Sequence, residues 1–246
     1  LRYFFEIYNC LMIETYVMNL FECDNISIVI RGKISEWTAD IVREYKAKFH
    51  NSEIIVSTWN NEKTDHMPCK IVRSVEPKIP SPHMSMINHQ TILAKEGLKE
   101  TSRDIVMVCR SDQFIHSQNI FSIFNSKCPK TKIMVSTFPG FLNGTPNDYR
   151  YEYAICDFCQ IGKNKLIHDF WDDVPYFDGS RSISVARTLT KNYVKNIKKD
   201  KQKWKNVKDL YFYERDYYKD FQIEWEKPIK SEFYTNSLNM RKLIRY

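Results

Sequence analysis

The chain has 246 residues, of which 43% are hydrophobic and 27% are charged. This length and balance exclude an intrinsically disordered chain and are typical of a globular domain with room for an appendage. The net charge of +7 is confined to residues 191–246, which hold 15 basic and 8 acidic side chains.

The chain alternates between apolar runs and amphipathic segments. Runs rich in β-branched residues predict strands at 25–30, 53–58, 70–75, 104–109, 132–137 and 153–157. Helical spacing of apolar residues predicts helices at 38–49, 86–99, 115–124 and 164–171. Because strands that alternate with helices imply crossover connections, we expect an α/β fold in which helices flank a mainly parallel sheet.

Three parts of the chain differ in pattern. Residues 1–24 are expected to form an N-terminal helical segment that packs on the domain, because charges interrupt the apolar residues too often for a membrane span; the alternative is a residual membrane anchor. Residues 25–178 hold the alternating pattern and are expected to form the α/β core, with a loop rich in proline, glycine and asparagine at 138–148. Residues 179–246 are expected to form a basic, aromatic-rich extension that packs on this core.

The segment Lys191–Lys208 carries eight lysines and a single acidic residue, Asp200. Four apolar residues recur in it at helical spacing, which predicts a basic amphipathic helix: Val194, Ile197, Trp204 and Val207. Its lysines either form a solvated helix face or attract an anionic membrane surface or a phosphorylated acceptor. No recognised nucleic-acid-binding motif accompanies the segment, so nucleic acid is not an expected partner.

The seven cysteines show no disulfide framework. Their number is odd, and Cys109 and Cys156 lie inside apolar runs, as reduced core cysteines do. We therefore expect a reducing, cytoplasmic location. The C-x-x-C sequence Cys156–Cys159 has no second pair, so a zinc site is not expected.

Polar residues stand where the predicted strands end. Arg31 and Gly32 follow the first strand, and Arg110, Ser111 and Asp112 follow the fourth. In open α/β sheets, ligands bind at the carboxyl edge of the strands. An aspartate there can hold a divalent cation against phosphate oxygens, and an arginine can bind a phosphate with its planar fork. The alternatives are a solvated turn or a purely structural arginine–aspartate pair.

Several familiar enzyme signatures are absent from the sequence. There is no Walker A or G-x-G-x-x-G loop, and no G-x-S-x-G, H-E-x-x-H or kinase motif. These absences argue against glycine-rich phosphate loops and weaken the hydrolase, metalloprotease and kinase interpretations.

An ordered set of segments carries a family resemblance. The set comprises a strand at 26–32 ending in Arg-Gly, a strand at 53–59 ending in Ser-Thr-Trp, Asn-His-Gln at 88–90 followed by Glu-Gly-Leu at 96–98, Cys-Arg-Ser-Asp at 109–112, and the stretch 153–171. In order and spacing it resembles the WavE family of lipopolysaccharide-synthesis proteins over roughly residues 25–175. The resemblance implies a glycosyltransferase with a GT-A-like, nucleotide-sugar-binding core.

The resemblance also implies roles for individual residues. Asp112 would hold Mn²⁺ or Mg²⁺ as the one carboxylate of an Asp-x-Asp-like element, and Asp157 would act as the catalytic base or contact the sugar. The implied donor-binding residues are Arg31, Gly32, Thr58, Trp59, Asn88, Gln90 and Arg110. Trp59 suits core packing equally well, and Asn88 suits a helix cap.

Two departures from the family pattern bear on function. Arg31 stands where the family usually has glutamine, and the expected Pro-Glu segment is not evident at 182–187. We expect a glycosyltransferase that moves a sugar from a nucleotide-sugar donor to a glycan or lipid-linked glycan acceptor, for lipopolysaccharide or another surface polysaccharide, at the cytoplasmic face of a membrane. The alternative, which both the single carboxylate and the missing segment favour, is a non-catalytic protein of the same fold that binds a glycan or a protein partner.

Overall fold

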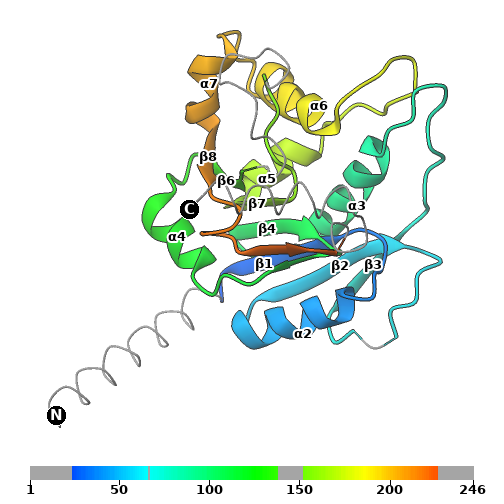
Figure 1. Ribbon diagram of the computed structural model, residues 1–246, viewed down its shortest axis with the longest axis vertical. Coiled ribbons are helices and arrows are strands. Elements are labelled where there is room, and N and C mark those ends of the chain that lie inside the picture. The colour runs from blue at the N-terminus through cyan, green and yellow to red at the C-terminus, as the bar shows by residue number, and fades with distance from the viewer. Residues whose placement is uncertain (1–23, 66, 138–151, 227–246) are drawn as a thin grey trace, which may run out of the picture.

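A seven-stranded sheet forms the centre of the computed structural model, which describes residues 24–65, 67–137 and 152–226 (Figure 1). The strand order is β3-β2-β1-β4-β7-β6-β8. Only β7 runs against its neighbours in this sheet, so the expected α/β fold with a mainly parallel sheet is confirmed. The strands are β1 (Ile26–Arg31), β2 (Glu53–Trp59), β3 (Lys70–Ser74), β4 (Ile105–Arg110), β6 (Ile133–Ser136), β7 (Cys159–Lys163) and β8 (Phe212–Arg215).

Helices cover both faces of the sheet. On one face lie α2 (Thr38–Lys48) and α4 (Ile120–Lys127), which bury their apolar sides against alternate residues of β1 such as Ile28 and Ile30. On the other face, Val29 of β1 belongs to the core shared with α3 (Ile87–Lys99), α5 (Asn164–Trp171), α6 (Val185–Lys191) and α7 (Trp204–Tyr211). The central strands β1 and β4 are mostly apolar because both of their faces are buried.

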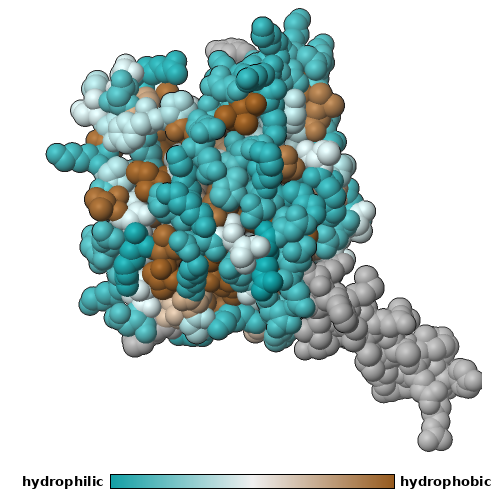
Figure 2. All heavy atoms as spheres, turned by 180° about the vertical axis from the view of Figure 1, so that it is seen from behind, coloured by the Kyte–Doolittle hydropathy of each residue, from teal (hydrophilic) through white to brown (hydrophobic). Residues whose placement is uncertain are grey.

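The outer surface of the back of the molecule carries mainly hydrophilic side chains (Figure 2). Within the described ranges, no helix is long and apolar enough to cross a membrane. The predicted N-terminal helical segment, the loop at 138–148 and the end of the C-terminal extension lie outside the described residues, except for Asp24.

Two predicted elements of the core were wrong in place or extent. The helix expected at 115–124 begins only at Ile120, because residues 113–115 form β5 (Gln113–Ile115) and pair with β9 (Ile223–Trp225). The strand expected at 153–157 is coil, and β7 follows it at Cys159. Ile155 and Cys156 are buried in the core, which accounts for the apolar pattern, but neither residue pairs with a strand.

The basic segment is not one helix. A π-helical turn at Asn192–Ile197 follows α6, and α7 begins only at Trp204. Lys199 has a φ of +55°, which is incompatible with a continuous right-handed helix. The chain therefore turns between two shorter helices. Val194 and Val207 are both buried, but they belong to different elements, the π-helical turn and α7.

The C-terminal extension also takes part in both sheets. Strand β8 pairs with β6 at the edge of the main sheet, from Ile133 opposite Phe212 to Ser136 opposite Arg215. Strand β9 pairs with β5, directly after the end of β4. The segment after residue 178 therefore reaches the carboxyl edge where the site residues were predicted.

Candidate functional site

A pocket of about 620 Å³ lies at the carboxyl ends of β1, β2 and β4. It brings together most of the predicted site residues: Arg31, Gly32, Trp59, Gln90, Arg110 and Asp112. This meeting follows from the parallel register, in which Arg31 lies opposite Ser57 on one side and Arg110 on the other. Three other predicted site residues are not among the described residues that line the pocket: Thr58, Asn88 and Asp157.

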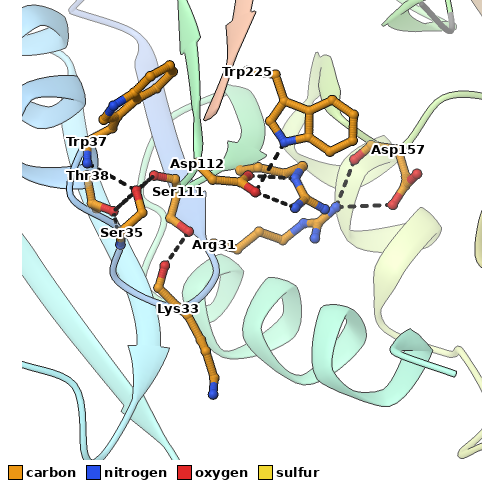
Figure 3. A network of polar contacts seen from close by, with 10 residues as sticks. Arg31, Lys33, Ser35, Trp37, Thr38, Ser111, Asp112, Asp157 and Trp225 are labelled. Carbon is orange, nitrogen blue, oxygen red and sulfur yellow. Dashed lines mark hydrogen bonds and ion pairs between the residues drawn. The ribbon is translucent and has the colours of Figure 1, made fainter. Parts of the chain in front are cut away.

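Arg110 and Asp112 form a two-pronged ion pair beside the pocket. Figure 3 shows Asp112 in this network of polar contacts, next to Trp225. Nε of Arg110 donates to Oδ1 of Asp112 at 2.8 Å, and Nη2 donates to Oδ2 at 2.7 Å. The indole N–H of Trp225 donates to the same Oδ2 at 3.2 Å. Burial lowers the pKa of Arg110, but the hydrogen bonds and the charge of Asp112 outweigh that effect and raise the pKa above its ordinary value.

Arg31 is buried at the end of β1 and is held by Asp157. Its Nη2 donates to the backbone carbonyl of Asp157 at 2.8 Å and lies 3.5 Å from the Oδ2 carboxylate oxygen. The guanidinium also lies 4.7 Å from the ring centre of Trp171, in a cation–π contact. Burial lowers the pKa of Arg31 to about 10, although the charge of Asp157 opposes this, so Arg31 remains cationic at neutral pH.

Gly32 lets the loops after β1 and β4 come into direct contact. Its φ is +145°, and a Cβ atom there would lie 2.1 Å from Oγ of Ser111. The Ser111 N–H donates to the Arg31 carbonyl, and the Ser111 hydroxyl donates to the carbonyl of Lys33. Thr38, the first residue of α2, donates its hydroxyl to the Ser111 carbonyl, so a helix start also fixes this loop.

His89 lines the pocket next to Trp59. The two rings meet edge-on with centroids 5.5 Å apart. Nε2 of His89 lies 3.7 Å from the carboxylate of Glu76, which Lys33 also approaches at 3.4 Å. Burial lowers the pKa of His89, and Glu76 opposes that effect only in part. Among the described residues, buried Nδ1 of His89 and Oε1 of Gln90 have no hydrogen-bond partner, which leaves these two polar atoms for a ligand.

The predicted residues outside the pocket have other surroundings. Asn88 does not cap α3: its side chain forms two hydrogen bonds with the backbone of Phe177. Thr58 is fully buried within β2. Asp157 is also buried and faces Arg31. The roles predicted for these three residues stay predictions.

Sequence reasoning missed several residues of the pocket. Lys33 and Ser35 directly follow the Arg-Gly strand end, so their place in the loop was a usable signal. His89 lies between the predicted residues Asn88 and Gln90 and lines the pocket, but it was not among the predicted site residues. Glu226 reaches the pocket only because β9 pairs with β5, and nothing near it in the sequence indicates this.

The pocket does not fit the expected Mn²⁺ or Mg²⁺ well. Both carboxylate oxygens of Asp112 already accept N–H groups, so a cation would have to displace Arg110. Across residues 24–65, 67–137 and 152–226, no three His, Cys, Asp or Glu side chains cluster in a way that could hold a metal ion. Both cations are bound by oxygen ligands. The carboxylate that was predicted to bind them, that of Asp112, already accepts hydrogen bonds from Arg110 and Trp225.

A protein-family model described as WavE lipopolysaccharide synthesis matches residues 26–219. The chain belongs to this family. The match spans the main sheet, α7 and the pocket residues other than Glu226, and it confirms the resemblance drawn from the ordered segments. Membership in WavE assigns the protein to lipopolysaccharide synthesis, which agrees with the expectation of a biosynthetic enzyme. A search of curated protein sequences found no match.

Solved structures show the same fold at low sequence identity. The 4-diphosphocytidyl-2C-methyl-D-erythritol synthase of Anaerococcus prevotii is 12% identical with a TM-score of 0.51, and the match covers 91% of this chain and 98% of that one. Glucosyl-3-phosphoglycerate synthase of Mycobacterium tuberculosis, solved with Mn²⁺, uridine diphosphate and glucosyl-3-phosphoglycerate, is 14% identical with a TM-score of 0.48, covering 78% and 69%.

A third similar structure is TarS of S. aureus, residues 1–349, which is 12% identical with a TM-score of 0.43. The match covers 69% of this WavE protein and 55% of TarS, so this chain spans about half of that structure. The likeness to the Anaerococcus prevotii enzyme, at 12% identity and a TM-score of 0.51, shows the fold alone.

Proposed function

We propose that this WavE protein is a glycosyltransferase that moves a sugar from a nucleotide-sugar donor to a glycan or lipid-linked glycan acceptor. The observation that carries the proposal is the pocket at the carboxyl edge of the sheet, where Arg31, Lys33 and Arg110 converge. Family membership in lipopolysaccharide synthesis supports the class of product. The volume of about 620 Å³ suits a small ligand of nucleotide-sugar size.

The chemistry explains why cations at this edge matter. Cleavage of the donor's glycosidic bond leaves negative charge on the nucleoside diphosphate, and preorganised positive groups stabilise that charge. Arg110 is held in place by Asp112, and Lys33 is 63% exposed at the pocket. The polar wall formed by His89 and Gln90 lies in the same pocket and is suited to the nucleoside or sugar part of the donor.

Proton removal from the acceptor hydroxyl is the step for which Asp157 was predicted. A general base must lie within hydrogen-bond reach of the proton it takes. Asp157 is buried and pairs with Arg31, so in this role it would have to turn away from Arg31 when the acceptor binds. We retain Asp157 as the proposed base or sugar contact on the family resemblance.

The proposal predicts that one class of nucleoside diphosphate sugar raises the melting temperature of the protein. The variant Gln90→Glu should lose most of this stabilisation, because a carboxylate in the pocket wall would repel the diphosphate. Gln118→Glu is the matched control, since it makes the same change at an exposed position in front of α4. Thermal shift against uridine, guanosine, cytidine and adenosine diphosphate sugars measures both variants.

Transfer of the sugar then separates the enzyme from the non-catalytic binding protein. Mass spectrometry of a lipopolysaccharide acceptor incubated with the stabilising donor should show the added sugar. Stabilisation without transfer to any acceptor tried would favour the binding protein. A wild-type protein that no nucleotide sugar stabilises would contradict the proposed donor site.

A further inference from the structure

The Arg110–Asp112 pair is built in a way that a metal site is not. Within the described part of the chain, Asp112 accepts three hydrogen bonds from side chains: two from Arg110 and one from the indole of Trp225. The Arg110 and Asp112 side chains are only 17% and 14% exposed. A cation bound to this carboxylate would lie beside the mostly buried guanidinium, which carries a like charge. Because water screens charges poorly in such a site, this repulsion would cost free energy.

The guanidinium itself is fixed from several directions. Its centre lies 5.6 Å from the ring centres of both Phe158 and Trp225, and these two rings also contact each other. The backbone N–H of Glu226 donates to the Asp112 carbonyl at 3.0 Å, which ties the end of β9 to the same loop. Segments from three parts of the chain therefore hold one arginine at the pocket wall.

The hydrogen bonds to Asp112 use only one edge of the Arg110 fork. Nε and Nη2 form the side edge, which faces the carboxylate. Of the five N–H groups of an arginine, three remain, and they include both hydrogens of Nη1. No hydrogen-bond partner of Nη1 occurs in the described part of the chain. This end edge has the geometry that binds a phosphate with two parallel hydrogen bonds.

We propose that Arg110, oriented by Asp112, binds the donor diphosphate directly and takes the place of a divalent cation, so that donor binding is independent of metal. This inference rests on the proposed function, because it assumes a nucleoside diphosphate donor. Asp112 is then a positioning residue rather than a metal ligand. Lys33 and Arg31 add positive charge on the neighbouring strand end.

The test is isothermal titration of the full chain with uridine diphosphate, guanosine diphosphate and inorganic pyrophosphate, each in EDTA and in excess Mn²⁺. We expect at least one probe to bind with the same affinity in both conditions. Arg110→Gln should weaken that binding in EDTA by about tenfold or more, which corresponds to ~1.4 kcal/mol. Asp112→Asn should still bind the probe in EDTA, because the guanidinium remains.

Arg43→Gln, on the exposed side of α2, is the matched control and should bind as the wild type does. Circular dichroism and melting temperature show whether each variant folds. Binding that requires Mn²⁺ and is lost in Asp112→Asn would overturn the inference while leaving the proposed glycosyltransferase intact. If no probe binds in either condition, the diphosphate donor and this inference fail together.

Discussion

His89 shows how one buried side chain can link the pocket to pH. The residue is 4% exposed, and burial lowers its pKa below the ordinary 6.5, with the nearby Glu76 opposing the effect. His89 is therefore neutral at neutral pH. Its Nδ1 has no hydrogen-bond partner among the residues that the structure describes, so the neutral ring can accept a hydrogen bond from a ligand when Nε2 carries the proton.

The lowered pKa predicts an acid-sensitive fold. As the pH falls through about 6.5, the unfolded chain binds a proton at this histidine before the folded chain does. Stability therefore falls until the pH passes the lower pKa of the folded state, and is flat beyond it. His89→Gln should remove this part of the slope, as measured by denaturant unfolding from neutral to acid pH. The exposed His50→Gln is the control, and an unchanged slope in His89→Gln would contradict the prediction.

Residues at the strand ends were the predictable part of the site. Arg31, Gly32, Arg110 and Asp112 follow apolar runs, and parallel strands bring such ends to one edge. The direction of a side chain is harder to foresee when a distant group decides it. Asn88 turns to the Phe177 backbone, 89 positions away, and no local pattern carries that information.

At the scale of elements, α3 is placed by a close approach to β1. Gly97 lies in the last turn of α3, where an added Cβ would be 2.5 Å from Cγ1 of Val29 and 3.0 Å from Cβ of Ser57. Both neighbours belong to fully buried strands, which cannot move away easily. The glycine therefore sets the distance between the helix and the sheet, and through it the position of the pocket wall.

Gly97→Ala should destabilise the protein by about 1–3 kcal/mol, because the extra methyl group overpacks the core. In an exposed helix, the same change would stabilise by about 1 kcal/mol, so the sign of the effect tests the packing. Urea unfolding measures it. Lys99→Ala, an exposed position in the same helix, should change stability by less than about 0.5 kcal/mol. A more stable Gly97→Ala would mean that α3 sits farther from β1 than described.

Long periodic elements were predicted better than short ones. The helix at 164–171 matches α5, since its apolar face is set by residues within one segment. Strands β5 and β9 have three residues each and are stabilised by pairing across more than a hundred positions, so neither has a local signature. The apolar stretch before β7 has the sequence pattern of a strand. Its apolar residues are buried in the core, but they do not pair with another strand.

At the scale of the whole molecule, the C-terminal segment contributes residues to the pocket at the carboxyl edge of the sheet. Strand β9 brings Trp225 to Asp112 and Glu226 to the pocket, although about a hundred residues separate them from the end of β4. A domain boundary at residue 178 stays a prediction, and strand β8 shows that the segment beyond it completes the central sheet. Composition separates this segment from the core, but composition does not reveal strand pairing.

The basic segment divides into partnered and exposed lysines. Lys198 binds Asp169, Lys208 binds Glu214, and Lys195 donates to the Gln202 carbonyl, so these lysines stabilise the fold. A second group is exposed and forms no ion pair with the described part of the protein: Lys191, Lys199, Lys201, Lys203 and Lys205. Four of these lie within the short stretch 199–205, which runs into the first turn of α7, the helix that also carries the exposed Leu210.

We propose that this exposed stretch holds the protein at an anionic membrane, where a lipid-linked acceptor would lie. A lysine near such a surface contributes about 1 kcal/mol. Changing Lys199, Lys201, Lys203 and Lys205 to glutamine should therefore lower binding to phosphatidylserine vesicles at least about tenfold at low salt. The charge-matched control changes four exposed lysines elsewhere to glutamine: Lys46, Lys63, Lys99 and Lys127. Vesicle sedimentation measures both variants, and an equal loss in both would show that net charge, rather than this stretch, drives the association.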